Sequence, residues 1–459
     1  FLVADAITRA GEDGRPPPDL LYTDEDKIDE HGRRSDPHFK PDFNRELLWG
    51  QHYMSHLMTV RRDVIERVGG FQEGYEGSQD YDLVLRCVAE TTPDRIVHIP
   101  HVGYHWRAIE GSTALATDAK RYPADAAKRA LADHLPPGWT VADAAAPTAY
   151  TALPPRPDPA PPVSIIIPTR NGLDLVERCV ASIEAKTIYP AYEIVLIDNQ
   201  TDQPEQRAAF EQMAADGRLR LLDYDDEFNY SAINNFGVGQ TDAPLVCLLN
   251  NDIEVIEPGW LDAMVRHAVR PDVGAVGAML LYGDDTIQHA GVVLGLGGVA
   301  GHSHKQFPGD AFGYFSRLTI AHQVGAVTAA CLVVRRLVYE EVGGLDADEL
   351  AVAFNDIDLC LRIHHAGYRN IWTPEARLYH HESVSRGAED TPEKQARFEA
   401  EVHVMLDRWG DELLHDPAYN PNLALDADSF TLARSPRVQP PWPRSGRSTN
   451  TLGRARVQE

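Results

Sequence analysis

The chain has 459 residues, a length that allows two to four domains, each with a substantial core. Hydrophobic residues make up 43% and charged residues 24% of it, as in an ordinary soluble protein. The formal net charge of −26 argues against nucleic acid as the main partner, because binding its phosphates needs clustered Lys and Arg. It does not exclude a phosphorylated small molecule held through a metal.

Five scattered cysteines lie in apolar runs, which indicates buried free thiols of a reducing compartment rather than disulfides or a zinc site. No run approaches the ~18 apolar residues of a membrane-spanning helix. The first residue is Phe1, so we expect the chain to be a piece of a longer protein.

Residues 1–135 carry the elements of an incomplete α/β unit. A short strand at 19–23 is followed directly by acidic residues, and a later helix and a final strand also have polar residues at their ends. The candidate site residues of this unit are Asp24, Asp26, Asp80 and His105. Residues 136–162 are rich in Pro and Ala and poor in charge, which predicts a stiff linker.

A complete unit, 163–387, follows the linker. Its predicted strands cover 163–167, 193–197, 219–222 and 245–249. Amphipathic helical stretches separate them, and this alternation predicts an α/β fold with a mostly parallel sheet and helices on both faces. Asn171, Asp198 and Asp252 each fall just beyond a strand, at the sheet edge where ligands of such folds bind.

The strand at 245–249 ends in three polar residues, Asn250, Asn251 and Asp252. In extended backbone Asn250 and Asp252 point the same way, and Asn251 points opposite. A carboxylate and an amide oxygen aimed together suit a hard divalent cation, which often arrives with substrate phosphates. The alternative is an ordinary turn, since Asn and Asp favour turns.

An internal repeat relates the two units. Residues 333–345 resemble 59–71, and 355–362 resemble 79–86. The matching pairs are Gly70 and Gly344, Asp80 and Asp356, and His105 and His380, at offsets of 274, 276 and 275 residues. We therefore expect the N-terminal unit to be the back half of a second copy whose front half is missing.

Asp26 aligns with Asp252 at a smaller offset, so the second copy is expected to carry an insertion. This insertion contains a Gly-rich segment with His289, His302 and His304, which is typical of a mobile loop at a binding site. Lone histidines are more often structural than catalytic.

Taken together, these motifs resemble the inverting family 2 glycosyltransferases of the GT-A fold, in the tandem-domain type that builds bacterial surface polysaccharide or O-antigen. The resemblance covers 163–387 in full and 19–115 in part. It implies contacts to a nucleotide-diphosphate sugar from Pro168, Thr169, Asn171, Asp198, Asn235, Asn250 and Asn251. It also implies a divalent metal, Mg²⁺ or Mn²⁺, at Asp252 with Asn250 and His380, and catalytic roles for Asp356 and Asp358.

The chemistry of sugar transfer fits these residues. A metal at Asp252 would stabilise the charge on the leaving diphosphate, and a carboxylate must take the proton of the attacking hydroxyl. Asp356 is the best candidate for this base, although it also suits a helix cap, and Asp358 reads as a supporting contact. Asn250 departs from the usual Asp of the family, so the substrate's phosphates are expected to hold much of the metal.

Two other functional classes are weighed against this one. A nucleotidyltransferase would want a Gly-rich, basic loop after the first strand, which 168–171 does not provide. Either copy could instead be a non-catalytic carbohydrate-binding module. The expected partners are the donor and a saccharide or lipid-linked acceptor, in the cytoplasm or at the inner face of the plasma membrane. Residues 388–434 predict a helical extension and 435–459 a disordered tail.

Overall fold

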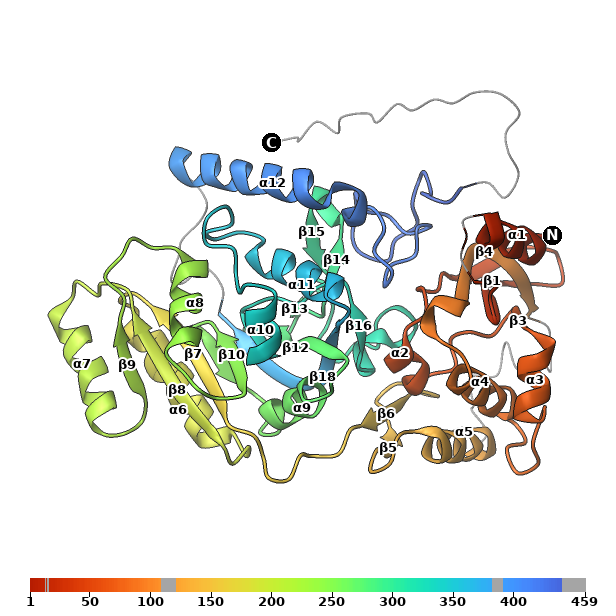
Figure 1. Cartoon of the computed structure of the whole chain (residues 1–459), viewed down its shortest axis with the longest axis horizontal. Helices are drawn as coiled ribbons and strands as arrows, with labels where there is room; N and C mark the ends of the chain where they lie inside the picture. Colours follow the sequence, from red (N-terminus) through yellow and green to blue (C-terminus); the bar gives the residue numbers. More distant parts are fainter. Residues whose placement is uncertain (13, 15, 109–120, 382–390, 440–459) are drawn as a thin grey trace.

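The computed structural model describes residues 1–12, 14, 16–108, 121–381 and 391–439. Two β-sheets lie side by side in it, each with its own helices (Figure 1). The smaller sheet has four strands, all N-terminal to the predicted linker, and the larger has ten strands that begin at Val163. Most of the predicted disordered tail, from residue 440 onward, lies outside the described residues.

The larger sheet follows the order β11-β18-β12-β17-β10-β7-β8-β9, with β13 on β12 and β16 on β18. Its strands are β7 (Val163–Thr169), β8 (Tyr192–Asp198), β9 (Arg220–Asp223), β10 (Leu245–Leu249), β11 (Ile253–Val255), β12 (Val273–Leu281), β13 (Ile287–His289), β16 (His322–Val324), β17 (Cys331–Arg335) and β18 (Arg369–His380). The α/β class is confirmed, and β7 to β10 are parallel to their neighbours among these four. Beyond them the sheet is mixed, because β17 runs antiparallel to both β10 and β12.

Helices cover both faces of this sheet (Figure 1). The helices are α6 (Leu173–Lys186), α7 (Pro204–Ala215), α8 (Tyr230–Gly239), α9 (Trp260–Ala268), α10 (Arg336–Glu341), α11 (Asn355–His365) and α12 (Pro392–Leu413). Side chains of β7 alternate between two cores: Ile165 and Ile167 pack with α6, α7 and α9, and Ile166 packs with α8, α10 and α11. Because both faces are covered, the strands read as unbroken apolar runs.

The N-terminal sheet repeats the back half of the larger one. Its elements are α1 (Leu2–Glu12), β1 (Leu20–Ile28), β2 (Arg34–His38), α2 (Arg45–Gly50), β3 (Met58–Val60), α3 (Arg62–Val68), α4 (Gln79–Ala89), β4 (Ile96–Arg107) and α5 (Arg121–His134). β1 is parallel to β4 and antiparallel to β3, as β12 is to β18 and β17. Thus β1 occupies the place of β12 and not that of β10.

This pairing corrects one sequence alignment. Asp26 lies on β1, so it is not the structural counterpart of Asp252, which follows β10. The polar triplets 24–26 and 250–252 resemble each other in sequence, but the first lies on β1 and the second follows β10, strands that occupy different places in their sheets. Among the described residues, the smaller sheet has no strands equivalent to β7, β8 and β10.

Part of the predicted linker is folded. Strands β5 (Thr140–Asp143) and β6 (Tyr150–Leu153) form a hairpin. Ala146, Ala149 and Tyr150 are buried in the core of the N-terminal unit, so only the residues after β6 connect the two units in extended form, along the lower edge of Figure 1.

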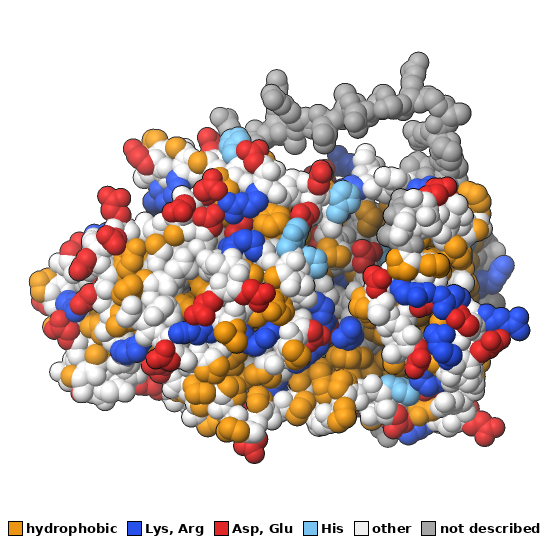
Figure 2. Space-filling view, viewed as in Figure 1, with side chains coloured by type: hydrophobic (Ala, Val, Ile, Leu, Met, Phe, Trp, Pro, Cys, Tyr) orange, Lys and Arg blue, Asp and Glu red, His pale blue; other side chains and the backbone are white. Residues whose placement is uncertain are grey.

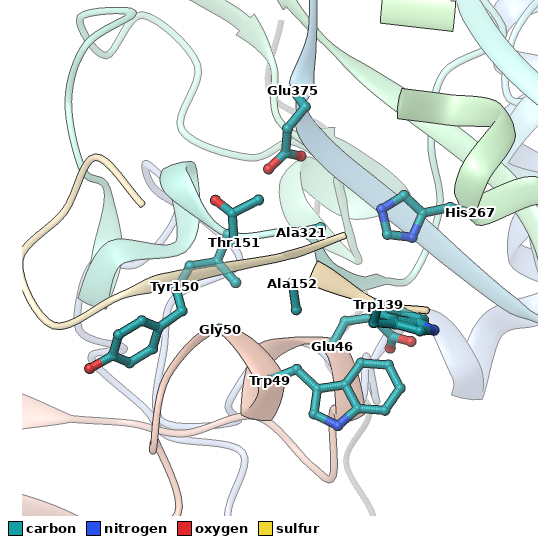
Figure 3. Close-up of a pocket in the computed structure, with 11 residues that line it drawn as sticks. Glu46, Trp49, Gly50, Trp139, Tyr150, Thr151, Ala152, His267, Ala321 and Glu375 are labelled. Atoms are coloured by element: carbon teal, nitrogen blue, oxygen red, sulfur yellow. The ribbon is translucent and has the colours of Figure 1, made fainter. Parts of the chain in front are cut away.

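Charged residues buried at the contact between the two units hold them together. Glu46 of α2 binds Arg270 at 2.7 Å and Arg369 of β18. Beside them is a small cavity of about 10 Å³, with Trp49 and Trp139 on one side and Glu375 projecting toward it from β18 (Figure 3). That volume holds at most about one water molecule, so the cavity is a packing gap and not a ligand site.

The C-terminal segment after α12 binds the N-terminal unit. Asn420 is buried and its amide donates to both carboxylate oxygens of Asp24, each at 3.0 Å, and Asn422 donates to the carbonyl of Pro100 at 2.9 Å. The N–H of Arg437 donates to the carbonyl of Pro421 at 2.9 Å. Residues 435–439, the start of the predicted disordered tail, are therefore ordered.

His98 should make the N-terminal unit less stable as the pH rises. Its buried ring lies 2.9 Å from Asp24 and 3.2 Å from Asp42. Burial lowers the pKa of His98, but the two carboxylates outweigh it and raise the pKa to about 9. Because this value exceeds that of the unfolded chain, ~6.5, the stabilisation is complete below that pH and is lost as the pH rises through about 9. Urea midpoints across this range should fall in the wild type and stay flatter in His98→Gln; parallel curves would contradict the assignment.

No helix of the described part of the chain is long and apolar enough to span a membrane. In the face shown in Figure 2, acidic and basic side chains are mixed over most of the surface. The five cysteines are buried and free, as their apolar surroundings predicted.

Candidate active site

A large cleft opens at the carboxyl ends of β7, β8 and β10, with a volume of about 1730 Å³. Its lining includes the loops after these strands, residues 328–330, the starts of α8, α11 and α12, and residues 380–381. The predicted site residues that line it are Pro168, Thr169, Asn171, Asn250, Asn251, Asp252, Asp356 and His380. The structure thus brings together residues that are up to about half the chain apart.

His380 lies against the polar end of β10. Its Nε2 is 3.2 Å from Oδ1 of Asp252 and 3.2 Å from the amide nitrogen of Asn250. β18 carries His380 beside Asp252 because β11, which follows Asp252 directly, pairs antiparallel with β18 at Ile253 and His380. This pairing explains how a histidine 128 positions later in the chain reaches the same point.

Gln288 fixes the orientation of the His380 ring. Its Oε1 is 2.6 Å from Nδ1 of His380, and its amide nitrogen is 3.5 Å from the His380 carbonyl. A carbonyl can only accept, so the amide nitrogen of Gln288 faces it and Oε1 must accept from the ring. The proton then sits on Nδ1, which leaves the Nε2 lone pair directed at Asp252.

The side-chain oxygen of Asn250 can complete a ligand set if the oxygen and nitrogen of its amide exchange places. Tyr230 Oη is 3.1 Å from Oδ1 of Asn250 and 3.2 Å from the carbonyl of Ala329. If the hydroxyl donates to Ala329, it can accept from the Asn250 amide once that amide is turned over. The oxygen of Asn250 then lies beside His380 Nε2 in place of the amide nitrogen.

Two oxygens and one imidazole nitrogen would then face one point. Neighbouring ligands of a six-coordinate Mg²⁺ lie about 3 Å apart, close to the two separations of 3.2 Å at His380. The residues fit a divalent metal. Within the described ranges no cluster of three His, Cys, Asp or Glu is placed to hold one, so this set needs the Asn250 amide and oxygens from a substrate.

Asp356 lies in the first turn of α11 and lines the same cleft. One oxygen accepts the N–H of Ala329 at 3.0 Å and the other accepts the N–H of Ile357 at 2.9 Å. Its helix-capping contact and its exposure to the cleft are therefore both present. The N–H of Asn250 donates to the carbonyl of Ala330 at 3.0 Å, so residues 328–330 join the metal-binding end to Asp356.

The loop after β7 is held open by polar contacts. Asn171 has a positive φ of 57°, and its side chain accepts the N–H of Asp202 at 3.2 Å. Asn251 donates to the hydroxyl of Thr169 at 2.9 Å, which ties the β10 turn to this loop. Asn251 and Asp252 form a turn between β10 and β11, so the alternative of a turn is present and the alternation of an extended strand does not apply to them.

Two residues assigned to the donor by resemblance lie outside the cleft lining. Asp198 is buried, and its oxygens accept from Thr201 at 2.5 Å and from Arg207 at 2.7 Å, so it fixes the loop after β8. Asn235 binds Leu345 and Tyr339 and so holds the loop before α11. Their structural role is to support the cleft walls rather than to line them.

Asp358 is not placed for catalysis. It is fully buried, accepts from Arg362 at 2.8 Å, and accepts from Arg408 at 2.7 Å and Trp409 at 2.9 Å of α12. Asp358 anchors α12 against α11 through these bonds, so its contact to the site is indirect. It lies in the first turn of α11, two residues after Asp356, but it does not line the cleft.

The candidate residues of the N-terminal unit do not form an equivalent cleft lining. Asp24 binds Asn420 and His98, and Asp26 binds Arg34 and His105. Asp80 is half exposed and accepts the N–H of Tyr81 at 2.9 Å, in the way that Asp356 accepts that of Ile357. Asp80 thus has the same local hydrogen bond as Asp356, but the described residues of this unit contain no counterpart of the turn after β10.

The histidines of the insertion differ in role. His302 lines the cleft, and its Nδ1 is 2.9 Å from Nδ1 of the buried His289. His304 is buried and accepts the N–H of Tyr314 at 3.0 Å. The Gly-rich segment forms a hairpin of β14 (Val292–Leu294) and β15 (Ala300–His302).

Sequence reasoning missed several residues of the cleft or its support, namely Gln288, Tyr230, Lys394, Arg397 and Glu401. The contacts of Tyr230, Glu401 and Gln288 with the cleft span 20 to 99 positions of the chain, and no local pattern marks them. The position of Gln288 directly before His289 in the insertion was the one available signal.

Residues 164–342 match the family model "Glycosyl transferase family 2". Over 430 residues the chain is 50% identical to "Uncharacterized protein y4gI" of Sinorhizobium fredii, which covers 93% of this chain and 47% of that protein. Over 423 residues it is 41% identical to "O-antigen biosynthesis protein RfbC" of Myxococcus xanthus, covering 91% and 32%. Over 252 residues it is 26% identical to "N-acetylglucosaminyl-diphospho-decaprenol L-rhamnosyltransferase" of Mycobacterium tuberculosis, covering 51% and 80%.

The chain spans less than half the length of the first two of these relatives. The matched residues include β7 to β10, the Asn250 to Asp252 turn and β17, the strands that shape the cleft. Residues 164–342, which carry these strands, are therefore similar to the domain of the glycosyl transferase family 2.

Proposed function

We propose that this chain transfers a sugar from a nucleotide-diphosphate donor to a saccharide or lipid-linked acceptor, with inversion at the anomeric carbon. The observation that carries the proposal is the content of one cleft, which is lined by Asp252, Asn250 and His380 and also by Asp356. Inverting transfer needs this pair of functions, a place that stabilises the leaving diphosphate and a base on the far side of the sugar.

The residues have distinct tasks in this proposal. Mg²⁺ or Mn²⁺, when bound, neutralises charge that develops on the diphosphate. Asp252 and His380 would hold it, with Asn250. Asp356 takes the proton of the acceptor hydroxyl, and the N–H groups of Ala329 and Ile357 keep its oxygens oriented. With one base and no covalent nucleophile, in-line attack inverts the anomeric carbon.

The relatives support a biological setting for this reaction. The 41% identity to the O-antigen protein of Myxococcus xanthus favours synthesis of a bacterial surface polysaccharide. The printed name of the mycobacterial relative, which includes a diphospho-decaprenol, favours a lipid-linked acceptor. We accordingly propose a cytoplasmic location, with peripheral association at the inner face of the plasma membrane where such an acceptor would lie.

The N-terminal unit is proposed to be a partial second copy. β1, β3 and β4 pair with one another in the same way as β12, β17 and β18 do, which supports this interpretation. In addition, α5 binds α4 as α12 binds α11. In the described chain it serves as a support: Glu46 binds Arg369 of the larger sheet, and the C-terminal segment binds the unit through Asn420. The division into units at 135 and 162 remains a prediction.

A donor screen tests the activity. The chain is incubated with Mn²⁺ and each common nucleotide sugar, and released nucleoside diphosphate is measured with and without saccharide acceptors. We expect one donor to be turned over, with loss of activity on chelation and recovery with Mn²⁺ or Mg²⁺. Turnover that persists unchanged after complete chelation would contradict the metal, and no turnover of any nucleotide sugar in the presence of acceptors would contradict the activity.

Gln288→Leu should weaken metal binding. The variant removes the acceptor that keeps the proton on Nδ1 of His380, so Nε2 is no longer reserved for a ligand bond. Partners of this kind typically contribute about 10- to 100-fold to metal affinity. Electron paramagnetic resonance of Mn²⁺ measures the affinity without turnover. Gln240→Leu, at an exposed residue after α8, is the control, and an unchanged affinity in Gln288→Leu would remove this role.

A further inference from the structure

The residue two positions before Asp356 is an aromatic one that also lines the cleft. Phe354 and Asp356 both belong to the cleft lining, and their Cα atoms lie no more than about 7 Å apart, the span of two residues. The ring of Phe354 is partly buried and contacts the ring of Phe398 of α12 at 5.4 Å between centroids. An apolar ring is therefore present in the cleft beside the proposed base.

The backbone at Phe354 has a conformation that a bulky side chain rarely adopts. Its φ is 58° and its ψ is 5°, in the left-handed region. A conformation of this kind is unfavourable and persists only where the surrounding contacts impose it.

Contacts on both sides of Phe354 impose this conformation. Before it, the buried Glu401 accepts the N–H of Val352 at 2.8 Å and that of Ala353 at 3.0 Å. After it, the N–H of Asp358 donates to the carbonyl of Phe354 at 2.9 Å. Helices α11 and α12 together thus set the position of the aromatic ring in the cleft.

The repeat shows that the helix motif itself does not need this residue. Ser78 has the same place before α4, two residues ahead of Asp80, and its φ is −145°. The N-terminal unit keeps the local hydrogen bond of Asp80, but its described residues include no counterpart of the turn after β10. The strained aromatic residue therefore accompanies the cleft and not the helix motif.

We propose that the ring of Phe354 is a platform on which a sugar ring of the acceptor stacks. This inference rests on the proposed function and adds the class of the acceptor, a saccharide whose attacking hydroxyl belongs to a sugar ring. One face of a sugar ring carries mainly C–H groups, and their partial positive charge suits the negative face of an aromatic ring. A sugar stacked on Phe354 has its hydroxyls beside Asp356, which must be within hydrogen-bond reach of the proton that it takes.

Binding of methyl glycosides tests this proposal without turnover. With Mg²⁺ and a saturating mixture of nucleoside diphosphates at the donor end, saturation-transfer NMR measures the methyl glycosides of glucose, galactose, mannose, rhamnose and N-acetylglucosamine. We expect at least one of them to bind, with the strongest transfer to the C–H protons of one ring face. Phe354→Leu should weaken this binding about three- to tenfold, because leucine is apolar but lacks the aromatic face, whereas Phe354→Tyr should bind like the wild type.

A second measurement needs no variant. In a chain that carries ring-deuterated phenylalanine, irradiation of the aromatic protons should transfer less saturation to the glycoside than in the protonated chain. Phe71→Leu is the control, since Phe71 is exposed and lies outside the cleft lining. It should bind the glycosides like the wild type, and urea midpoints show whether each variant is folded.

Several outcomes would overturn the proposal: no glycoside binds the wild type, a folded Phe354→Leu binds as tightly as the wild type, a folded Phe354→Tyr loses as much affinity as Phe354→Leu, or deuteration leaves the transfer unchanged. Loss of affinity for the nucleoside diphosphate alone would place Phe354 at the donor, and loss confined to the probe farnesol would place it at a lipid. A chain that binds glycosides as expected but turns over no nucleotide sugar would contradict the proposed function and not the stacking.

Discussion

Asp356→Asn should reduce sugar transfer by about 10²- to 10⁴-fold while donor binding is retained. The amide cannot take the proton of the acceptor hydroxyl, and the loss of a general base typically has an effect of this size. The substitution keeps one oxygen for the N–H of Ala329 or Ile357, so α11 should stay in place. Release of nucleoside diphosphate with acceptor present measures turnover, and calorimetry with Mn²⁺ measures donor binding.

Asp80→Asn is the matched comparison. Asp80 has the same place in the repeated motif and accepts the N–H of the next residue at 2.9 Å, as Asp356 does. It faces no described turn equivalent to 250–252. Turnover should therefore be unchanged in Asp80→Asn. Equal turnover in Asp356→Asn and the wild type would remove Asp356 as the base, and a loss in both variants would place catalysis in both units.

The fold was predictable where local pattern decides it. Unbroken apolar runs at 163–167 and 245–249 became β7 and β10, because both faces of each strand are covered by helices. The cleft was predictable from the polar residues that follow these strands. Neither prediction required knowledge of which strands pair.

Pairing and docking were not predictable in the same way. Asp26 and Asp252 both come after short apolar runs of sequence, and only the pairing of β1 with β3 and β4 shows that Asp26 lies on a different strand of the fold. Asp358 reads like a second catalytic acid, but its partners Arg408 and Trp409 lie on α12, fifty positions later. Long-range contacts decide both cases, and a single sequence does not display them.

Asp358→Ala should lower the stability of the chain and loosen α12 together. The side chain is fully buried, and its removal leaves Arg362 and Arg408 without their shared carboxylate. Breaking a buried ion pair costs about 3–5 kcal/mol, and we expect about 3 kcal/mol because Arg362 and Arg408 remain 23% and 28% exposed and regain hydration. The urea midpoint measures the loss.

The N-terminal unit offers a matched variant of this anchor. Asp82 is fully buried and binds Arg86 of its own helix and His134 of α5, as Asp358 binds Arg362 of its helix and Arg408 of α12. Asp82→Ala should therefore destabilise the chain without changing binding at the cleft. Asp358→Ala should destabilise the chain and also weaken binding at the cleft, since α12 carries Lys394 and Arg397, which line the cleft. If Asp358→Ala lost turnover at an unchanged urea midpoint, the residue would act in the chemistry and not as an anchor.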